Sequence, residues 1–194
     1  MRENGVVTSP KNSLTLPLQC HPATPPGVPL VLSVAVSVIN IGLQLVYTVC
    51  ADCAALRIPT ATAPGPADGL WLHTCLEAFV AIEGDEAYRE FNFSPSGQWA
   101  IYNFASERLK ASNDVDAPMP LAIQLHASTE QVTLTTHLPW GALPLRGSVV
   151  CVGLSAVIEE ANGHLSYWAL QHPCAQPDFH HPAGRALRLA LPNP

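Results

Sequence analysis

Hydrophobic and polar residues alternate along most of this chain with the period of two that is typical of β-strands. Short segments rich in Gly, Asn, Asp and Ser interrupt the alternation and indicate turns. The pattern predicts strands at 14–18, 30–39, 43–51, 74–82, 87–93, 99–104, 121–127, 131–138, 147–158, 164–170 and 186–191. A polar loop is expected over 105–120, and the one helical element considered is a short turn at 106–110 within it. Strands that follow one another with turns between them predict an all-β fold, an antiparallel β-sandwich.

The hairpin predicted over 74–93 carries polar residues at matching positions of its two strands. If its turn is centred on the Gly-Asp pair, Glu77 lies opposite Asn92 and Phe79 lies opposite Glu90. Cross-strand neighbours of this kind have Cβ atoms about 5 Å apart. The hairpin therefore predicts a polar patch of Glu77, Glu90 and Asn92 on one face of the sheet.

Such a patch has two interpretations. It is either a solvated outer face, as antiparallel sheets commonly have, or a ligand-binding face. Trp71, Trp99 and Tyr102 flank the patch in the sequence, which favours the second interpretation. Flat aromatic side chains beside carboxylates and amides suit sugar rings, although tryptophan is also an ordinary core residue of a sandwich.

Three segments carry a family resemblance: DGLWLHTCLEAF at 68–79, YREFNFSPSGQW at 88–99 and SYWALQHPCAQPDFHH at 166–181. They resemble the DOMON-like domains of bacteria, which are similar to the family 9 carbohydrate-binding modules. Those modules carry a Trp, a Glu-aliphatic-Phe strand and a Tyr-x-Glu-Phe strand that ends in Asn and Pro. The resemblance covers roughly residues 14–191 and implies a β-sandwich that binds sugar or haem.

Together, the residues and the resemblance lead us to expect non-catalytic binding of a saccharide or a sugar-containing small molecule. The expected stacking residues are Trp71, Trp99, Tyr102 and Trp168. The residues expected to bond sugar hydroxyls, or to hold a cation, are Glu77, Glu90 and Asn92. The resemblance to sugar modules implies calcium or another divalent cation as a cofactor. Paired carboxylates could act as acid and base, but no nucleophile pattern accompanies them, so an enzyme is not expected.

Two alternatives stay open. Haem-binding DOMON proteins typically use a Met with a His or Lys; here Met119 is the one methionine besides Met1, and bis-His ligation by two of the eight histidines is a further option. The other alternative is an interaction module with no small ligand. In the loop predicted over 171–184, His172, Asp178 and His180 are candidate metal ligands; the other interpretation is a structural loop held by hydrogen bonds of Asp178.

Composition and charge bear on the number of domains, the class of partner and the cellular location. The 194 residues include 48% hydrophobic residues, enough for one large domain over 14–194 after a flexible tail at 1–13. A net charge of −6 with nine basic residues argues against nucleic acid as a partner. The six cysteines are expected to be reduced because the N-terminus has no secretory signal pattern, and a cytoplasmic location is expected.

The apolar run 27–50 has the length of a membrane span, but its alternation and central Asn-Ile-Gly indicate two strands, so no membrane partner is expected. Free edge strands of the sandwich could pair two copies into a homodimer.

Overall fold

The computed structural model describes residues 13–111, 121–143 and 149–191, and these form the predicted β-sandwich. Most of the predicted tail lies outside the described residues. One sheet, sheet A, contains in order β4 (Gly65–Pro66), β7 (Gln98–Ser106), β6 (Tyr88–Phe93), β5 (Cys75–Ile82), β11 (Val149–Glu159) and β12 (Leu165–Ala169). Two further strands join this sheet: β8 (Leu109–Lys110) pairs with β7, and β13 (Leu187–Ala190) pairs with β11.

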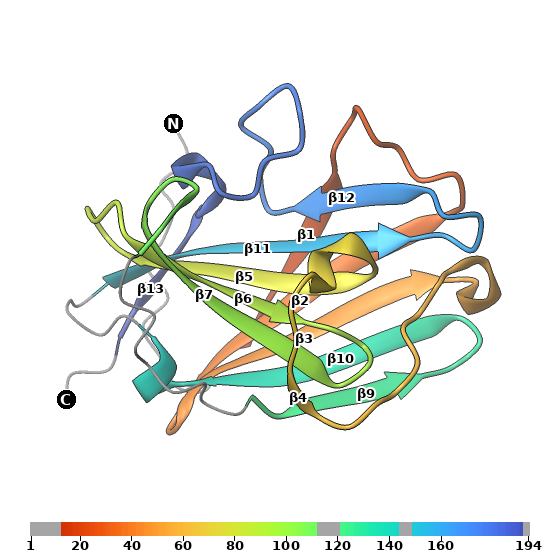
Figure 1. Ribbon diagram of the computed structural model, residues 1–194, viewed down its shortest axis with the longest axis horizontal. Helices are drawn as coiled ribbons and strands as arrows, with labels where there is room; N and C mark the ends of the chain where they lie inside the picture. Colours follow the sequence, from red (N-terminus) through yellow and green to blue (C-terminus); the bar gives the residue numbers. More distant parts are fainter. Residues whose placement is uncertain (1–12, 112–120, 144–148, 192–194) are drawn as a thin grey trace.

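The second sheet, sheet B, contains β2 (Leu30–Ile39), β3 (Gly42–Ala51), β10 (Gln131–Pro139) and β9 (Ile123–Ala127). Strand β1 (Leu14–Cys20) joins the two sheets, because its first part pairs with β2 and its last two residues pair with β12. Figure 1 shows β5, β11 and β12 of sheet A and β9 and β10 of sheet B running roughly along the long axis of the molecule. Among the strands that the structure describes, the pairings are antiparallel except for the parallel pair β4 and β7.

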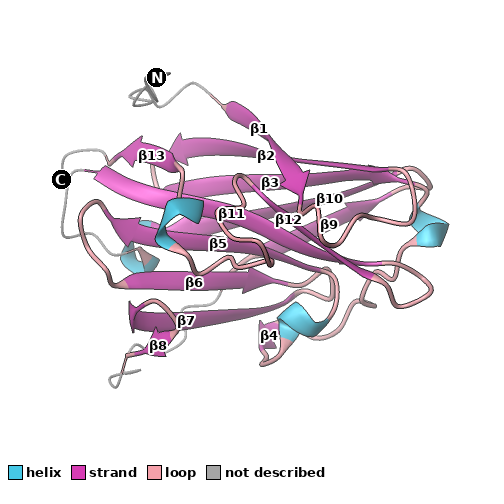
Figure 2. Cartoon of the chain, turned by 90° about the horizontal axis from the view of Figure 1, so that it is seen from above, coloured by secondary structure: helices cyan, strands magenta, loops and turns pink. Residues whose placement is uncertain are grey.

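Helical structure in the described residues is limited to single turns in the connections (Figure 2). These turns are η1 (Cys53–Ala55), η2 (Leu70–Leu72), η3 (Trp140–Ala142) and η4 (Pro182–Gly184). The apolar run 27–50 contributes β2 and β3, as the alternation predicted. Among the described residues, no helix is long and apolar enough to cross a membrane.

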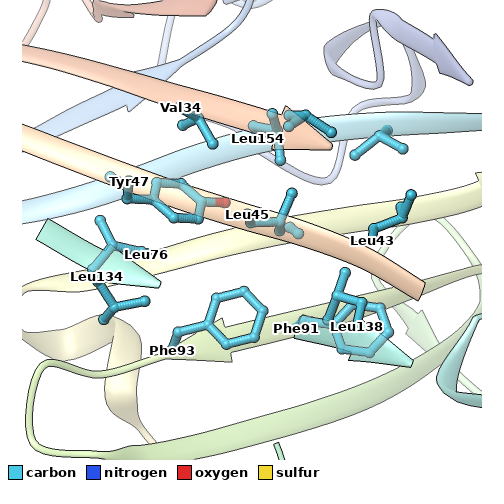
Figure 3. Close-up of a cluster of buried hydrophobic side chains, with 14 of the residues drawn as sticks. Val34, Leu43, Leu45, Tyr47, Leu76, Phe91, Phe93, Leu134, Leu138 and Leu154 are labelled. Carbon is cyan, nitrogen blue, oxygen red and sulfur yellow. The ribbon is translucent and has the colours of Figure 1, made fainter. Parts of the chain in front are cut away.

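The core lies between the two sheets and is built from the inward positions of each strand. Figure 3 shows leucine and valine side chains of β2, β3 and β10 facing Leu76, Phe91 and Phe93 of sheet A. Tyr47 of β3 is completely buried among them, and its hydroxyl donates a 2.6 Å hydrogen bond to the main-chain carbonyl of Glu77. A polar side-chain atom thus links the two sheets through their apolar core.

The register of the central hairpin is the one that the sequence predicts. Glu77 pairs with Asn92, and Phe79 pairs with Glu90. The predicted helical turn at 106–110 is wrong, because the chain makes a tight β-turn there and Leu109–Lys110 returns as strand β8. Arg108 adopts the left-handed conformation (φ 58°) that such a tight turn requires.

The outer face of sheet A is covered by the segment 171–186, which we call the C-terminal segment. Phe179 and His180 of this segment pack against the ring of Phe79, with ring centroids 6.4 and 5.3 Å apart. On the same face Glu77 and Asn92 are 2% and 0% exposed. The polar patch of the hairpin is therefore buried and is not a solvated face.

Candidate functional site

A cavity of about 420 Å³ opens on the outer face of sheet A, beside the C-terminal segment. Its floor is formed by strand residues of the sheet: Glu77 and Phe79 of β5, Glu90 of β6 and Val157 of β11. One wall comes from η2, β7 and β8, and the other comes from β12 and the C-terminal segment. This volume lies within the range of pockets that bind small molecules, about 300–1,000 Å³.

Aromatic side chains form parts of both walls. On one side Trp71, 40% exposed, meets Tyr102 edge to face, with centroids 5.7 Å apart and ring planes at 73°. The Tyr102 hydroxyl donates a hydrogen bond to Asp68. On the other side Tyr167 and Phe179 pack together at 6.0 Å. The large exposed ring of Trp71 is an apolar surface on which a flat ligand can stack.

The floor carries two carboxyl groups. Glu77 accepts a 3.3 Å hydrogen bond from the Ser155 hydroxyl, and Glu90 accepts a 2.6 Å hydrogen bond from the Asn92 amide. Burial raises the pKa of Glu77 well above its ordinary value, and the charge of Glu90 raises it further. Burial also raises the pKa of Glu90, against the effect of the Asn92 hydrogen bond. A protonated carboxyl can both donate and accept, so the floor offers both kinds of hydrogen bond.

Two cationic side chains, Arg108 and Lys110, stand at the β7–β8 wall of the cavity. Arg108 donates from Nη2 to Asp178 over 2.8 Å, and its main-chain N–H donates to the Tyr88 hydroxyl over 3.2 Å. The Lys110 ammonium lies over the ring of Tyr102, 4.6 Å from the centroid. The positive charges of both residues act to lower the pKa of Glu90.

Sequence reasoning missed both cations because it assigned their segment to a helical turn. The available signal was the alternation of Tyr102 and Phe104 on the outer face. Because β7 and β8 form a hairpin, Lys110 pairs with Phe104 and lies beside the outer face of sheet A.

His180 closes one side of the floor. Its Nδ1 lies 2.7 Å from the Tyr88 hydroxyl, and its Nε2 lies 3.8 Å from Glu90. Burial, together with the positive charge of Arg108, lowers the pKa of His180 to about 4. The imidazole is therefore neutral at pH 7, so Nδ1 accepts the Tyr88 proton and Nε2–H faces Glu90.

The residues predicted as ligand contacts fall into two groups. Trp71, Glu77, Glu90 and Tyr102 line the cavity, and Asn92 lies beneath it as the hydrogen-bond donor to Glu90.

Trp99 and Trp168 do not reach the cavity, which corrects the prediction that they stack on a ligand. They are 4% and 6% exposed and belong to the core between the sheets. Their side chains point inward because Trp99 shares a strand face with Ile101, and Trp168 shares one with Ser166, to which it donates a 2.9 Å hydrogen bond. Fully enclosed aromatic rings of this kind stabilise the sandwich.

The three candidate metal ligands do not converge on one point. His172 bonds the main-chain carbonyl of Gln19 over 2.8 Å, His180 bonds Tyr88, and Asp178 pairs with Arg108. Asp178 also accepts the main-chain N–H of His180 over 3.0 Å, the kind of contact expected of a structural loop. No cluster of three His, Cys, Asp or Glu side chains suited to a metal occurs within the residues the structure describes.

Of the comparisons with known proteins, the one with solved structures finds similar folds. No protein-family model matches the chain, and no curated protein matches it. Among solved structures, a presumed carbohydrate-binding protein from Bacteroides uniformis matches with a TM-score of 0.65 and 20% identity, over 92% of this chain and 86% of that one.

Two structures of a family 9 carbohydrate-binding module from Caldicellulosiruptor kristjanssonii also match. The complex with cellotriose has a TM-score of 0.64 and 7% identity, over 96% of this chain and 86% of that one. The complex with glucose has a TM-score of 0.57 and 6% identity, over 91% and 84%. The chain therefore has the β-sandwich fold seen in family 9 carbohydrate-binding modules.

Proposed function

We propose that this protein binds a saccharide in the cavity on sheet A and does not act on it chemically. The observation that carries the proposal is the meeting, in one cavity, of the exposed Trp71 ring with the buried carboxyl groups of Glu77 and Glu90. Sugar rings have apolar C–H faces that stack on aromatic rings and hydroxyl groups that need donors and acceptors. The similar fold of modules solved with cellotriose and glucose supports this choice of ligand.

The state of the two carboxyl groups supports binding over hydrolysis. A glycosidase of the common type needs one carboxylate that is ionised and free to act as nucleophile or base. Glu77 is enclosed by protein with its pKa raised, and Glu90 is held by Asn92. Both groups are suited to fixing hydroxyl positions, with Trp71 and Tyr102 forming the adjacent wall.

The test is calorimetric titration of the protein with glucose and cellotriose, followed by a wider glycan panel. We expect Trp71→Ala to weaken binding of the best glycan by about two- to tenfold, since aromatic stacking contributes about 0.5–1.5 kcal/mol. Ile41→Ala is the matched control, because Ile41 is also an exposed hydrophobic residue but lies in the β2–β3 turn. Thermal unfolding of both variants verifies that they fold. An unchanged affinity of Trp71→Ala, or no binding across the panel, would contradict the proposal.

An absorption spectrum before and after addition of haem tests the competing ligand that the resemblance implies. We expect no Soret band. A Soret band that disappears in His180→Ala, the variant lacking the histidine of the cavity wall, would replace the saccharide with haem.

A further inference from the structure

We infer that the saccharide is acidic: a sugar ring with an anionic substituent that Lys110 and Arg108 receive at the cavity wall. This inference rests on the proposed function and specifies its ligand class. The shared chemistry is a carboxylate or phosphate group carried on a sugar.

The first argument is the pairing of charges around the cavity. The carboxyl groups near it each accept a hydrogen bond from a protein group: Asp68 from Tyr102, Asp178 from Arg108, Glu77 from Ser155 and Glu90 from Asn92. For Lys110, in contrast, no carboxylate lies within 4 Å among the residues that the structure describes. Within the described part of the chain the Lys110 ammonium thus has no carboxylate partner, so a ligand anion can pair with it.

The second argument concerns how Arg108 is held. One guanidinium nitrogen donates to Asp178, which fixes the side chain and leaves further N–H donors of the five that an arginine carries. The left-handed backbone of Arg108 and the bond from its N–H to Tyr88 place the residue at this point of the wall. A non-glycine residue in this conformation carries a backbone strain of order 1 kcal/mol, so the position is well determined by its surroundings.

The third argument is the distribution of basic residues. The chain has nine Lys and Arg residues and a net charge of −6, yet two of the nine line this one cavity. Only two lysines occur in the sequence, Lys11 and Lys110. Both cationic side chains are exposed, Arg108 to 58%, so their attraction for an anion is screened by salt. Burial raises the pKa of both Glu77 and Glu90, which reduces their repulsion of an anion, although the Asn92 hydrogen bond and the two cations act the other way on Glu90.

The experiment compares glucose, glucuronate and glucose 6-phosphate by calorimetric titration at pH 7. We expect at least one of the two acidic sugars to bind about tenfold more tightly than glucose, as charge-assisted hydrogen bonds allow. Lys110→Met should remove most of this preference, measured as the ratio of each acidic sugar's affinity to that of glucose for the same variant. The preference should also shrink as salt is raised from about 0.05 to 0.5 M.

Arg188→Met is the matched control, because it removes one positive charge from β13, where Arg188 pairs with Glu83, outside the cavity lining. It should keep the preference for the acidic sugar. Glucose binding as tightly as both acidic sugars, or a preference that survives in Lys110→Met, would overturn this inference and leave the proposed function standing. Absence of binding by all three sugars and by the glycan panel would overturn both.

Discussion

Glu77 carries an ionisable carboxyl group on a residue that is only 2% exposed. Because its pKa in the folded protein is raised, the folded state holds a proton there more tightly than the unfolded state does. Its contribution to stability is greatest below the ordinary glutamate pKa. This stabilising contribution is lost as the pH rises from the ordinary glutamate pKa through the higher pKa of Glu77 in the folded protein.

We therefore predict that Glu77→Gln stabilises the protein at high pH. The amide keeps the shape and the hydrogen-bonding capacity of the side chain but carries no charge, so the free energy of unfolding should rise at pH 8 and change little at pH 4. Urea unfolding at both pH values measures it. Glu86→Gln, in the exposed β5–β6 turn, is the control and should change stability little at either pH. A Glu77→Gln protein less stable than the original at pH 8 would contradict the prediction.

The site residues that could be predicted from the sequence are those on strands, because alternate residues of a strand point to opposite faces of the sheet. Alternation places Glu77, Glu90 and Tyr102 on one face of sheet A, and all three line the cavity. The same parity separates Trp99 from Tyr102, since residues three apart in a strand point to opposite faces. Proximity in sequence suggested a stacking role for Trp99 that parity does not allow.

At the scale of elements, the C-terminal segment converts an outer sheet face into an enclosed site. Its anchor is His180, which contacts Phe79, Tyr88 and Glu90. The segment has no periodic pattern, so the sequence could predict a loop but not the face that it covers. The register of the β5–β6 hairpin, by contrast, was predictable from the position of its turn, because a turn centred on Gly84 and Asp85 places Glu77 opposite Asn92.

We predict that His180 makes the protein sensitive to acid. Its folded pKa of about 4 lies below the ordinary value of 6.5, so only the unfolded chain takes up a proton as the pH falls from 6.5 towards 4. Stability is therefore lost in that window. His180→Gln should flatten this part of the dependence of the unfolding temperature on pH, whereas His126→Gln on the exposed strand β9 should not. Equal slopes for the original protein and His180→Gln would show that another group is responsible.

At the scale of the whole molecule, cohesion of the two sheets comes mainly from apolar packing, and Tyr47 adds a hydrogen bond across it. We predict that Tyr47→Phe lowers the free energy of unfolding by about 1 kcal/mol, the usual net contribution of one such bond. Urea unfolding measures the loss. Tyr167→Phe, at a hydroxyl on the cavity wall, is the comparison and should cost less. Equal losses would show that the contact across the core has no special part in joining the sheets.

Association between copies stays a prediction. Strand β9 pairs with β10 on one side, and none of its residues between Ile123 and Ala127 is charged. Charged residues are one of the means by which proteins prevent edge strands from pairing. Light scattering of the purified protein decides between a monomer and a dimer.

The division of the cavity between floor and walls bears on how such a protein can change. The floor lies on strands whose opposite faces fill the core, so a substitution there alters fold and recognition together. The walls come from η2, the β7–β8 turn and the C-terminal segment, which lie at the periphery of the sandwich. Insertions or substitutions in those three connections can give descendants of one ancestral scaffold new ligand preferences, and the same three segments are where a designer would randomise the chain.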